Sequence, residues 1–87
     1  MMNEHKTQFG AFVRDQIQTY KTSHGLTNED IAAILQEDVR SYAGQRSGKY
    51  GFSALSLAHF ILELQGEERD VFMEKMLEEV GKIRDGA

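Results

Sequence analysis

The segment from residue 26 to residue 49 constrains the fold more than any other part of the chain. Thr27 and Asp30 have the spacing of an acidic capping box, the pattern that begins a helix, and an apolar run continues from there to Leu35. Gly48 lies thirteen residues after Leu35. This spacing predicts a short helix, a polar turn, a second short helix and a loop.

The composition of the chain favours helices throughout. Proline is absent, most glycines stand where helices are expected to end, and good helix formers are plentiful. The 87 residues suffice for one domain with its own core but not for two. We therefore expect a single all-α domain over residues 1–87.

The chain contains no cysteine, which excludes a disulfide scaffold, Cys-ligated zinc and a Cys nucleophile. A cytoplasmic location is therefore expected. Residues 1–6 are polar, and no apolar run reaches the length of a membrane span. We expect neither a signal peptide nor a membrane anchor.

Apolar residues at spacings of three and four predict buried faces on the first two helices. The first helix is expected to end near His24, with Gly25 as its left-handed cap. Its buried stripe comprises Phe9, Phe12, Val13, Ile17 and Tyr20. The second helix, which starts at Thr27, is expected to bury Ile31, Ile34 and Leu35.

The third expected helix follows a polar stretch in which Glu37 or Asp38 can act as its N-cap. Helical spacing divides its residues into two faces. The inward face is expected to be Val39, Tyr42 and Ala43, and the outward face Arg40, Ser41, Gly44 and Gln45. A loop is expected over residues 47–51.

Two more helices are expected in the remaining part of the chain. Ser53 is the expected N-cap of a fourth helix that runs to Gln65, where Gly66 ends it. Apolar residues cover most of its circumference, which predicts the most buried helix of the bundle. A fifth helix with a broad apolar arc is expected over residues 67–84.

Three motifs, in this order, are similar to those of one family of regulators. They are Gly25-Leu26-Thr27-Asn28-Glu29-Asp30-Ile31-Ala32, Arg46-Ser47-Gly48-Lys49 and Phe52-Ser53-Ala54-Leu55. Over residues 9–65 the chain resembles the lambda-repressor-like, or xenobiotic-response-element type, helix-turn-helix domains of phage and bacterial regulators. The resemblance implies a compact five-helix bundle in which the second and third helices form the helix-turn-helix.

The resemblance also implies a set of DNA-binding residues. Asn28 takes the place of a residue that contacts a DNA phosphate. The third helix meets base edges in the major groove, and the residues after it meet the DNA backbone. The implied base-edge residues are Arg40, Ser41, Gly44 and Gln45, and the implied backbone residues are Arg46, Lys49 and Tyr50. Arg40 suits guanine and Gln45 suits adenine, because each can form two hydrogen bonds with that base.

The turn before the third helix departs from the family pattern. Gln36 replaces the usual glycine, Glu37 replaces an apolar residue, and Asp38 adds a carboxylate close to where DNA phosphate would lie. We expect a rearranged turn in which Val39 fills the apolar position and Glu37 faces water, since burying an unpaired carboxylate is costly. Gly44 either permits a close approach of DNA or a partner, or ends the third helix early.

The sequence shows no pattern of catalytic or metal-binding chemistry. His5, His24 and His59 have no metal-ligand spacing, and the serines lack the context of a nucleophile. Gly48 and Lys49 lack the preceding glycine of a phosphate-binding loop. We therefore expect no enzyme, no metal and no cofactor.

Two functions remain open. The first is a sequence-specific DNA-binding transcriptional regulator, a small dimeric repressor that binds a palindromic operator in double-stranded DNA. Its homodimer interface is expected on the fifth helix, at Val71, Met73, Leu77 and Val80. The second is a degenerate helix-turn-helix module that does not read DNA and binds another protein, as an antirepressor, antitoxin-like partner or inhibitor, through the acidic turn and the apolar fifth helix. Glu37, Asp38 and the net charge of −4 favour this second function.

Overall fold

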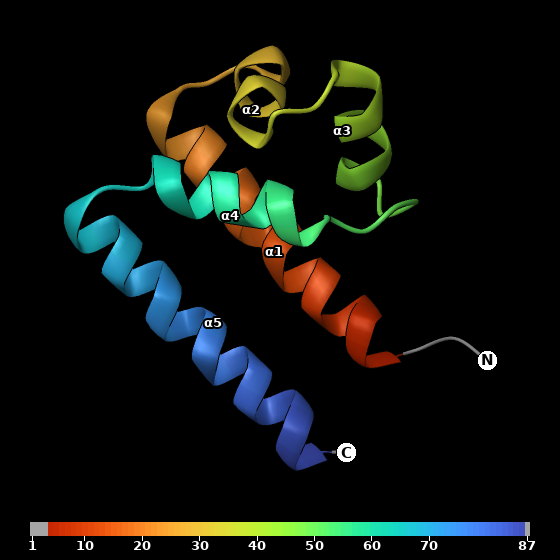
Figure 1. Ribbon diagram of the computed structural model, residues 1–87, viewed down its shortest axis with the longest axis vertical. Helices are drawn as coiled ribbons and strands as arrows, with labels where there is room; N and C mark the ends of the chain where they lie inside the picture. The colour runs from red at the N-terminus through yellow and green to blue at the C-terminus, as the bar shows by residue number, and fades with distance from the viewer. Residues whose placement is uncertain (1–3, 87) are drawn as a thin grey trace.

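Helices account for most of the described chain, as the computed structural model in Figure 1 shows. The structure describes the backbone of residues 4–86 and the side chains of residues 8–86, so His5 lies outside the described side chains. The elements are α1 (Glu4–His24), α2 (Asn28–Leu35), α3 (Val39–Arg46), α4 (Ala54–Glu63) and α5 (Gly66–Gly86). No residue between 4 and 86 is in a strand, which confirms the all-α prediction.

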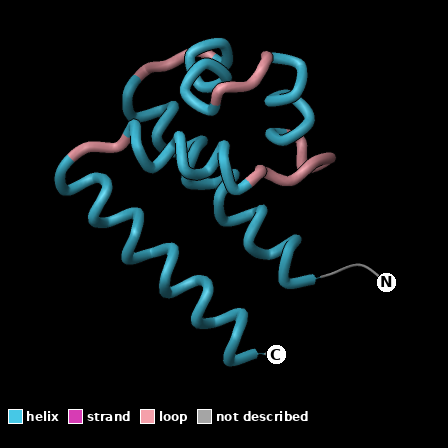
Figure 2. The backbone as a smooth tube through the Cα atoms, viewed as in Figure 1, coloured by secondary structure: helices cyan, strands magenta, loops and turns pink. Residues whose placement is uncertain are grey.

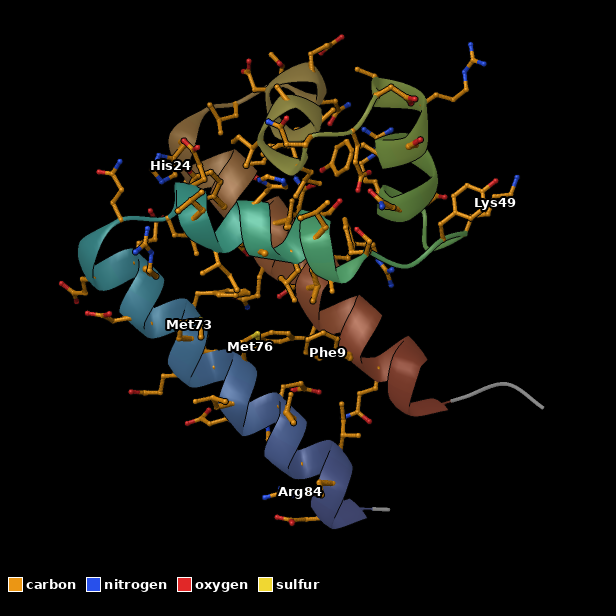
Figure 3. The ribbon with its side chains drawn as sticks, in the orientation of Figure 1. Phe9, His24, Lys49, Met73, Met76 and Arg84 are labelled. Carbon is orange, nitrogen blue, oxygen red and sulfur yellow. The ribbon has the colours of Figure 1, made fainter. Side chains whose placement is uncertain are left out.

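The two long helices α1 and α5 run antiparallel (Figure 1). Near one end of the pair, Gln8 Nε2 donates a hydrogen bond to Glu79 Oε2 over 2.8 Å, and near the other, His24 Nε2 lies 3.0 Å from Glu68 Oε2. Apolar side chains of both helices lie between them, among them Phe9, Met73 and Met76 (Figure 3).

All five helices contribute buried residues to the core, and its aromatic centre lies where α1, α4 and α5 meet. The ring of Phe60 on α4 makes edge-to-face contacts with Tyr20 and with Phe72, each at 5.4 Å between ring centroids. The buried residues of the core are Val13, Ile17, Tyr20, Ile31, Ala32, Leu35, Tyr42, Phe60, Leu64 and Phe72, with Phe9, Phe12 and Ile34 packed against them. The apolar stripes predicted for the first two helices are therefore confirmed.

The short loops between the helices follow from local hydrogen bonding (Figure 2). Gly25 has a φ of +64°, which makes it the left-handed residue after α1, as expected. Thr27 Oγ1 accepts from the N–H of Asp30 over 3.1 Å, and the carboxylate of Asp30 accepts from the N–H of Thr27 over 2.9 Å. Ser53 caps α4 by accepting from the N–H of Ser56 over 3.0 Å. The capping box and the Ser53 cap are thus confirmed.

Helix α4 is not the most buried helix, although its composition predicts that it should be. It packs on one side only, through Ser56, Phe60 and residues near them, while Leu55 and Leu62 on the opposite side are 68% and 70% exposed. The prediction was wrong because apolar residues on an outer helix face have the same sequence pattern as apolar residues inside a core.

The junction between α4 and α5 also differs from expectation. Helix α4 ends at Glu63, and Gly66, with a φ of +56°, is the first residue of α5. The guanidinium of Arg69 on α5 lies over the end of α4 and donates to the carbonyl groups of Ile61 and Leu62 in α4 and of its C-cap Leu64, over 3.0–3.1 Å. These carbonyl groups have no partner within their own helix, so Arg69 supplies the missing donors.

Candidate functional site around helix α3

The turn that leads from α2 into α3 is tight. Gln36 has a φ of 60° and is the one non-glycine residue with positive φ among residues 4–86. Its N–H donates to the carbonyl of Ala33 over 3.1 Å, and the N–H of Glu37 donates to the carbonyl of Ala32 over 2.9 Å. Gln36 therefore adopts the left-handed backbone conformation that glycine usually adopts at the end of a helix.

Asp38 is the N-cap of α3, and of the two candidate caps, Glu37 and Asp38, it is the one that the structure uses. The carboxylate of Asp38 accepts from the N–H of Ser41 over 2.7 Å. This bond, helped by the nearby charge of Arg40, holds the pKa of Asp38 below its usual value. The side chains of Arg40 and Ser41 are both exposed, as expected for the outward face.

The inner face of α3 differs from the predicted one. Tyr42 is buried as expected, but Val39 is 42% exposed and does not fill an apolar position. Gln45, predicted to face outward and read adenine, is only 6% exposed. Its Nε2 donates to Glu37 Oε2 over 3.0 Å and to the carbonyl of Gly51 over 3.3 Å. The amide nitrogen of Gln45 is therefore occupied inside the protein, and its Oε1 is buried without a hydrogen-bond partner among the described residues.

Glu37 turns inward, and the expected exposure to water was wrong. Its Oε2 accepts from Gln45 Nε2 and makes a close hydrogen bond with the hydroxyl of Ser56 on α4. The same hydroxyl lies 3.2 Å from the carbonyl of Leu35, so its single proton is shared between two acceptors. These donors replace water around Oε2, whereas Oε1 is buried without a hydrogen-bond partner among the described residues, so the penalty on which the prediction depended is offset only in part.

Gly44 is enclosed by its own chain. A β-carbon at this position would lie 2.3 Å from Cδ2 and 2.5 Å from Cε2 of Tyr50. The loop folds back over α3, and the N–H groups of Lys49 and Tyr50 donate to the carbonyl of Gly44 over 2.9 and 3.2 Å. Gly44 does not end α3, which continues to Arg46, and the space beside it is filled by the ring of Tyr50.

Three exposed cations lie on α3 and the loop after it. They are Arg40, Arg46 and Lys49, and residues 39–51 contain no acidic residue. The guanidinium of Arg46 lies 5.7 Å from the ring centre of Tyr42, and Lys49 Nζ lies 5.4 Å from that of Tyr50. Figure 3 shows Lys49 at the outer edge of the molecule. We call these three residues the basic surface.

A fourth cation was not found from the sequence. Arg14 on α1 lies beside the loop, and a β-carbon at Gly48 would be 3.5 Å from its guanidinium carbon. Arg14 is half-buried and lies 34 positions before Gly48. No local pattern connects residues so distant in sequence, so only the packing of α1 against the loop shows that Arg14 borders the basic surface.

The remaining predicted DNA contact, Asn28, is the first residue of α2 and is half-buried. Its Oδ1 is buried and has no hydrogen-bond partner among the described residues. On α5, Val71, Leu77 and Val80 are exposed, whereas Met73 is half-buried and packs against the core. Met73 is therefore placed less favourably for a second subunit than the sequence indicated.

The described side chains include no group of three or more His, Asp or Glu residues that could hold a metal ion. No helix between residues 4 and 86 is both long enough and apolar enough to cross a lipid bilayer. Comparisons with protein-family models, curated proteins and solved structures found no match to this chain. Its function therefore has to be inferred from its own side chains.

Proposed function

We propose that this chain is a sequence-specific DNA-binding transcriptional regulator that reads the major groove with α3. In this proposal α2, the turn and α3 act as a helix-turn-helix of the lambda-repressor-like type. The observation that carries it is the basic surface. Arg40, Arg46 and Lys49 are exposed and have no carboxylate within ion-pair distance among the described side chains, in a chain whose net charge is −4. Unpaired cations gathered on one segment are what phosphate binding requires.

Base recognition in this proposal rests on the first turn of α3. Arg40 is exposed there and can donate two hydrogen bonds to guanine, a contact typically worth about 1–3 kcal/mol of discrimination. Ser41 and Val39 are exposed beside it and would supply a hydroxyl and an apolar contact for a thymine methyl group. Gly44 and Gln45 are not part of this reading surface, because the chain itself covers them.

The other cations would hold the DNA backbone. Arg46 and Lys49 lie at the end of α3 and in the loop after it, and Arg14 lies behind that loop. Asn28 at the start of α2 would add an amide contact to a phosphate. Asp38 opposes these contacts, because its carboxylate lies beside Arg40 and would repel phosphate.

The palindromic operator and the homodimer belong to the same proposal. Two copies related by a two-fold axis would place two α3 helices in successive major grooves. The exposed residues Val71, Leu77 and Val80 on α5 support a dimer interface there.

Selection of bound fragments from random duplex DNA tests the reading function. The wild-type chain is expected to enrich one motif, and Arg40→Ala is expected to lose that enrichment. Arg84→Ala is the matched control, since Arg84 is also an exposed cation and lies on α5, away from the basic surface. Failure of the wild-type chain to enrich any motif would reject sequence-specific binding, and equal enrichment by all three proteins would reject reading by Arg40.

A specific observation also supports the second function, a module that binds another protein. Leu55 and Leu62 are the two leucines on the outer side of α4, seven residues apart and both largely exposed. In this alternative α4 rather than α3 carries the contact. The double variant Leu55→Ser and Leu62→Ser would then abolish partner binding, Arg40→Ala would leave partner binding unchanged, and the wild-type chain would enrich no DNA motif.

A further inference from the structure

Helix α3 depends on a few contacts for its stability. It has eight residues, fewer than the ~12 that an isolated helix needs to be even marginally stable in water. Gly44 inside it lowers helix propensity further. Its buried side chains are those of Tyr42 and Gln45. One aromatic ring and one amide thus connect α3 to the rest of the protein.

The amide contact passes through Glu37. Glu37 Oε2 accepts from Gln45 on α3 and from Ser56 on α4, so one oxygen joins the turn to both helices. Gln45 extends the connection to the carbonyl of Gly51 in the following loop, and Ser56 extends it to the carbonyl of Leu35 at the end of α2. We call Glu37, Gln45 and Ser56 the Glu37 network.

We propose that Glu37 is a positioning residue whose inward carboxylate holds α3 folded against α4 in the orientation that presents Arg40. The effect of the Glu37 network on α3 order is independent of what α3 binds. The consequence for DNA affinity rests on the function proposed above. The resembled family has an apolar residue at the position of Glu37. In this chain the hydrogen bonds of the Glu37 carboxylate take the place of apolar packing under α3.

Two substitutions at Glu37 separate positioning from charge. Glu37→Ala removes the acceptor and leaves the amide of Gln45 and the hydroxyl of Ser56 buried without it. Glu37→Gln keeps an oxygen acceptor of the same reach and removes the negative charge. If position matters, Gln rescues and Ala does not; if the charge matters, both substitutions have the same effect.

Hydrogen exchange of the backbone amides of the full chain measures the order of α3 directly. In Glu37→Ala, the exchange of residues 42–46 is expected to be about tenfold faster or more, with little change in the central turns of α1. Glu37→Gln is expected to exchange at the wild-type rate. Unchanged exchange of α3 in Glu37→Ala, or equal acceleration in both variants, would overturn the proposal.

DNA affinity is the second measurement. Affinity for the enriched motif is expected to fall about tenfold or more in Glu37→Ala and to be retained in Glu37→Gln. If the wild-type chain binds no DNA, the proposed function fails while the exchange result still decides the role of Glu37. If Glu37→Ala unfolds the whole chain, Ser56→Ala removes one donor only and is expected to accelerate exchange in α3 alone. Acceleration spread evenly over all helices in Ser56→Ala would overturn positioning.

Discussion

The ring of Tyr50 occupies the position that a side chain at Gly44 would need. A β-carbon at Gly44 would come within 2.3 Å of the Tyr50 ring, much closer than two carbon atoms can approach. A glycine in the middle of an eight-residue helix is therefore explained by a contact from the loop that follows it.

This contact predicts the effect of Gly44→Ala. Alanine gains about 1 kcal/mol of helix propensity over glycine, but the displaced Tyr50 ring should offset this gain and leave the chain destabilised by ~1 kcal/mol. Chemical denaturation measures the difference. Gly81→Ala is the matched control, because Gly81 lies inside α5 and a β-carbon there would have nothing within 4 Å, so this substitution is expected to stabilise. In a Tyr50→Ala background Gly44→Ala should become stabilising, and a failure to do so would contradict the explanation.

Gln36→Gly is expected to stabilise the protein by ~0.5–1 kcal/mol. Gln36 has a φ of 60°, and a left-handed conformation costs a residue with a side chain about 1–2 kcal/mol, which glycine avoids. Loss of the hydrogen bond from Gln36 Nε2 to the carbonyl of Ala33 reduces the gain. Gln18→Gly, at an exposed position inside α1, should instead destabilise by about 1 kcal/mol. Equal effects of the two substitutions in thermal unfolding would reject a role for the backbone conformation of Gln36.

The free energy of unfolding should decrease at acidic pH, because protonation removes the stabilising contribution of two carboxylates at helix N-termini, those of Asp30 and Asp38. Hydrogen bonds from Thr27 and from Ser41 lower the pKa of Asp30 and of Asp38, respectively. A carboxyl group with a lowered pKa in the folded state stabilises fully above its unfolded pKa, near ~3.9, and loses this contribution as the pH falls through its folded pKa. Unfolding measured between neutral pH and acid should show this loss. In the double variant Asp30→Asn and Asp38→Asn the loss should be smaller, and an unchanged pH profile would contradict the assignment.

Leu77→Lys is expected to convert a dimer into a monomer without loss of fold. Leu77 is largely exposed, so the folded single chain should tolerate lysine there, whereas an apolar interface should not. Sedimentation at micromolar concentration measures the mass of the assembly. Glu78→Lys, a neighbouring exposed position, is the control for the change of charge. A monomeric wild-type chain under these conditions would remove the proposed interface on α5.

The sequence predicted those parts of the fold that short-range patterns determine. The capping box of Thr27 and Asp30, the cap at Ser53 and the left-handed Gly25 each depend on residues at most three positions apart, and each was confirmed. The apolar stripe of α1 was confirmed for the same reason, because helical spacing alone defines it.

The candidate site was predicted less well, because long-range contacts determine it. Arg40 and Ser41 are exposed as expected, but Glu37 turns inward to meet Ser56, which lies 19 positions after it, and Gln45 turns inward to meet Glu37. Sequence patterns place a polar side chain of a helix at the surface unless a buried hydrogen-bond partner for it is known. The rotation of α3 about its own axis depends on the partner of Gln45. Helical spacing does not identify that partner, and the prediction therefore placed Val39 on the inner face.

Arg69 connects α5 to the end of α4 across the junction between the two helices. Its guanidinium donates to the carbonyl groups of Ile61, Leu62 and Leu64, so the two helices are joined by hydrogen bonds as well as by the chain. We expect these hydrogen bonds to restrain the angle between α4 and α5. If two copies associate through α5, that angle sets the spacing between their α3 helices, and the half-site separation of a palindrome becomes a property that Arg69 helps to determine.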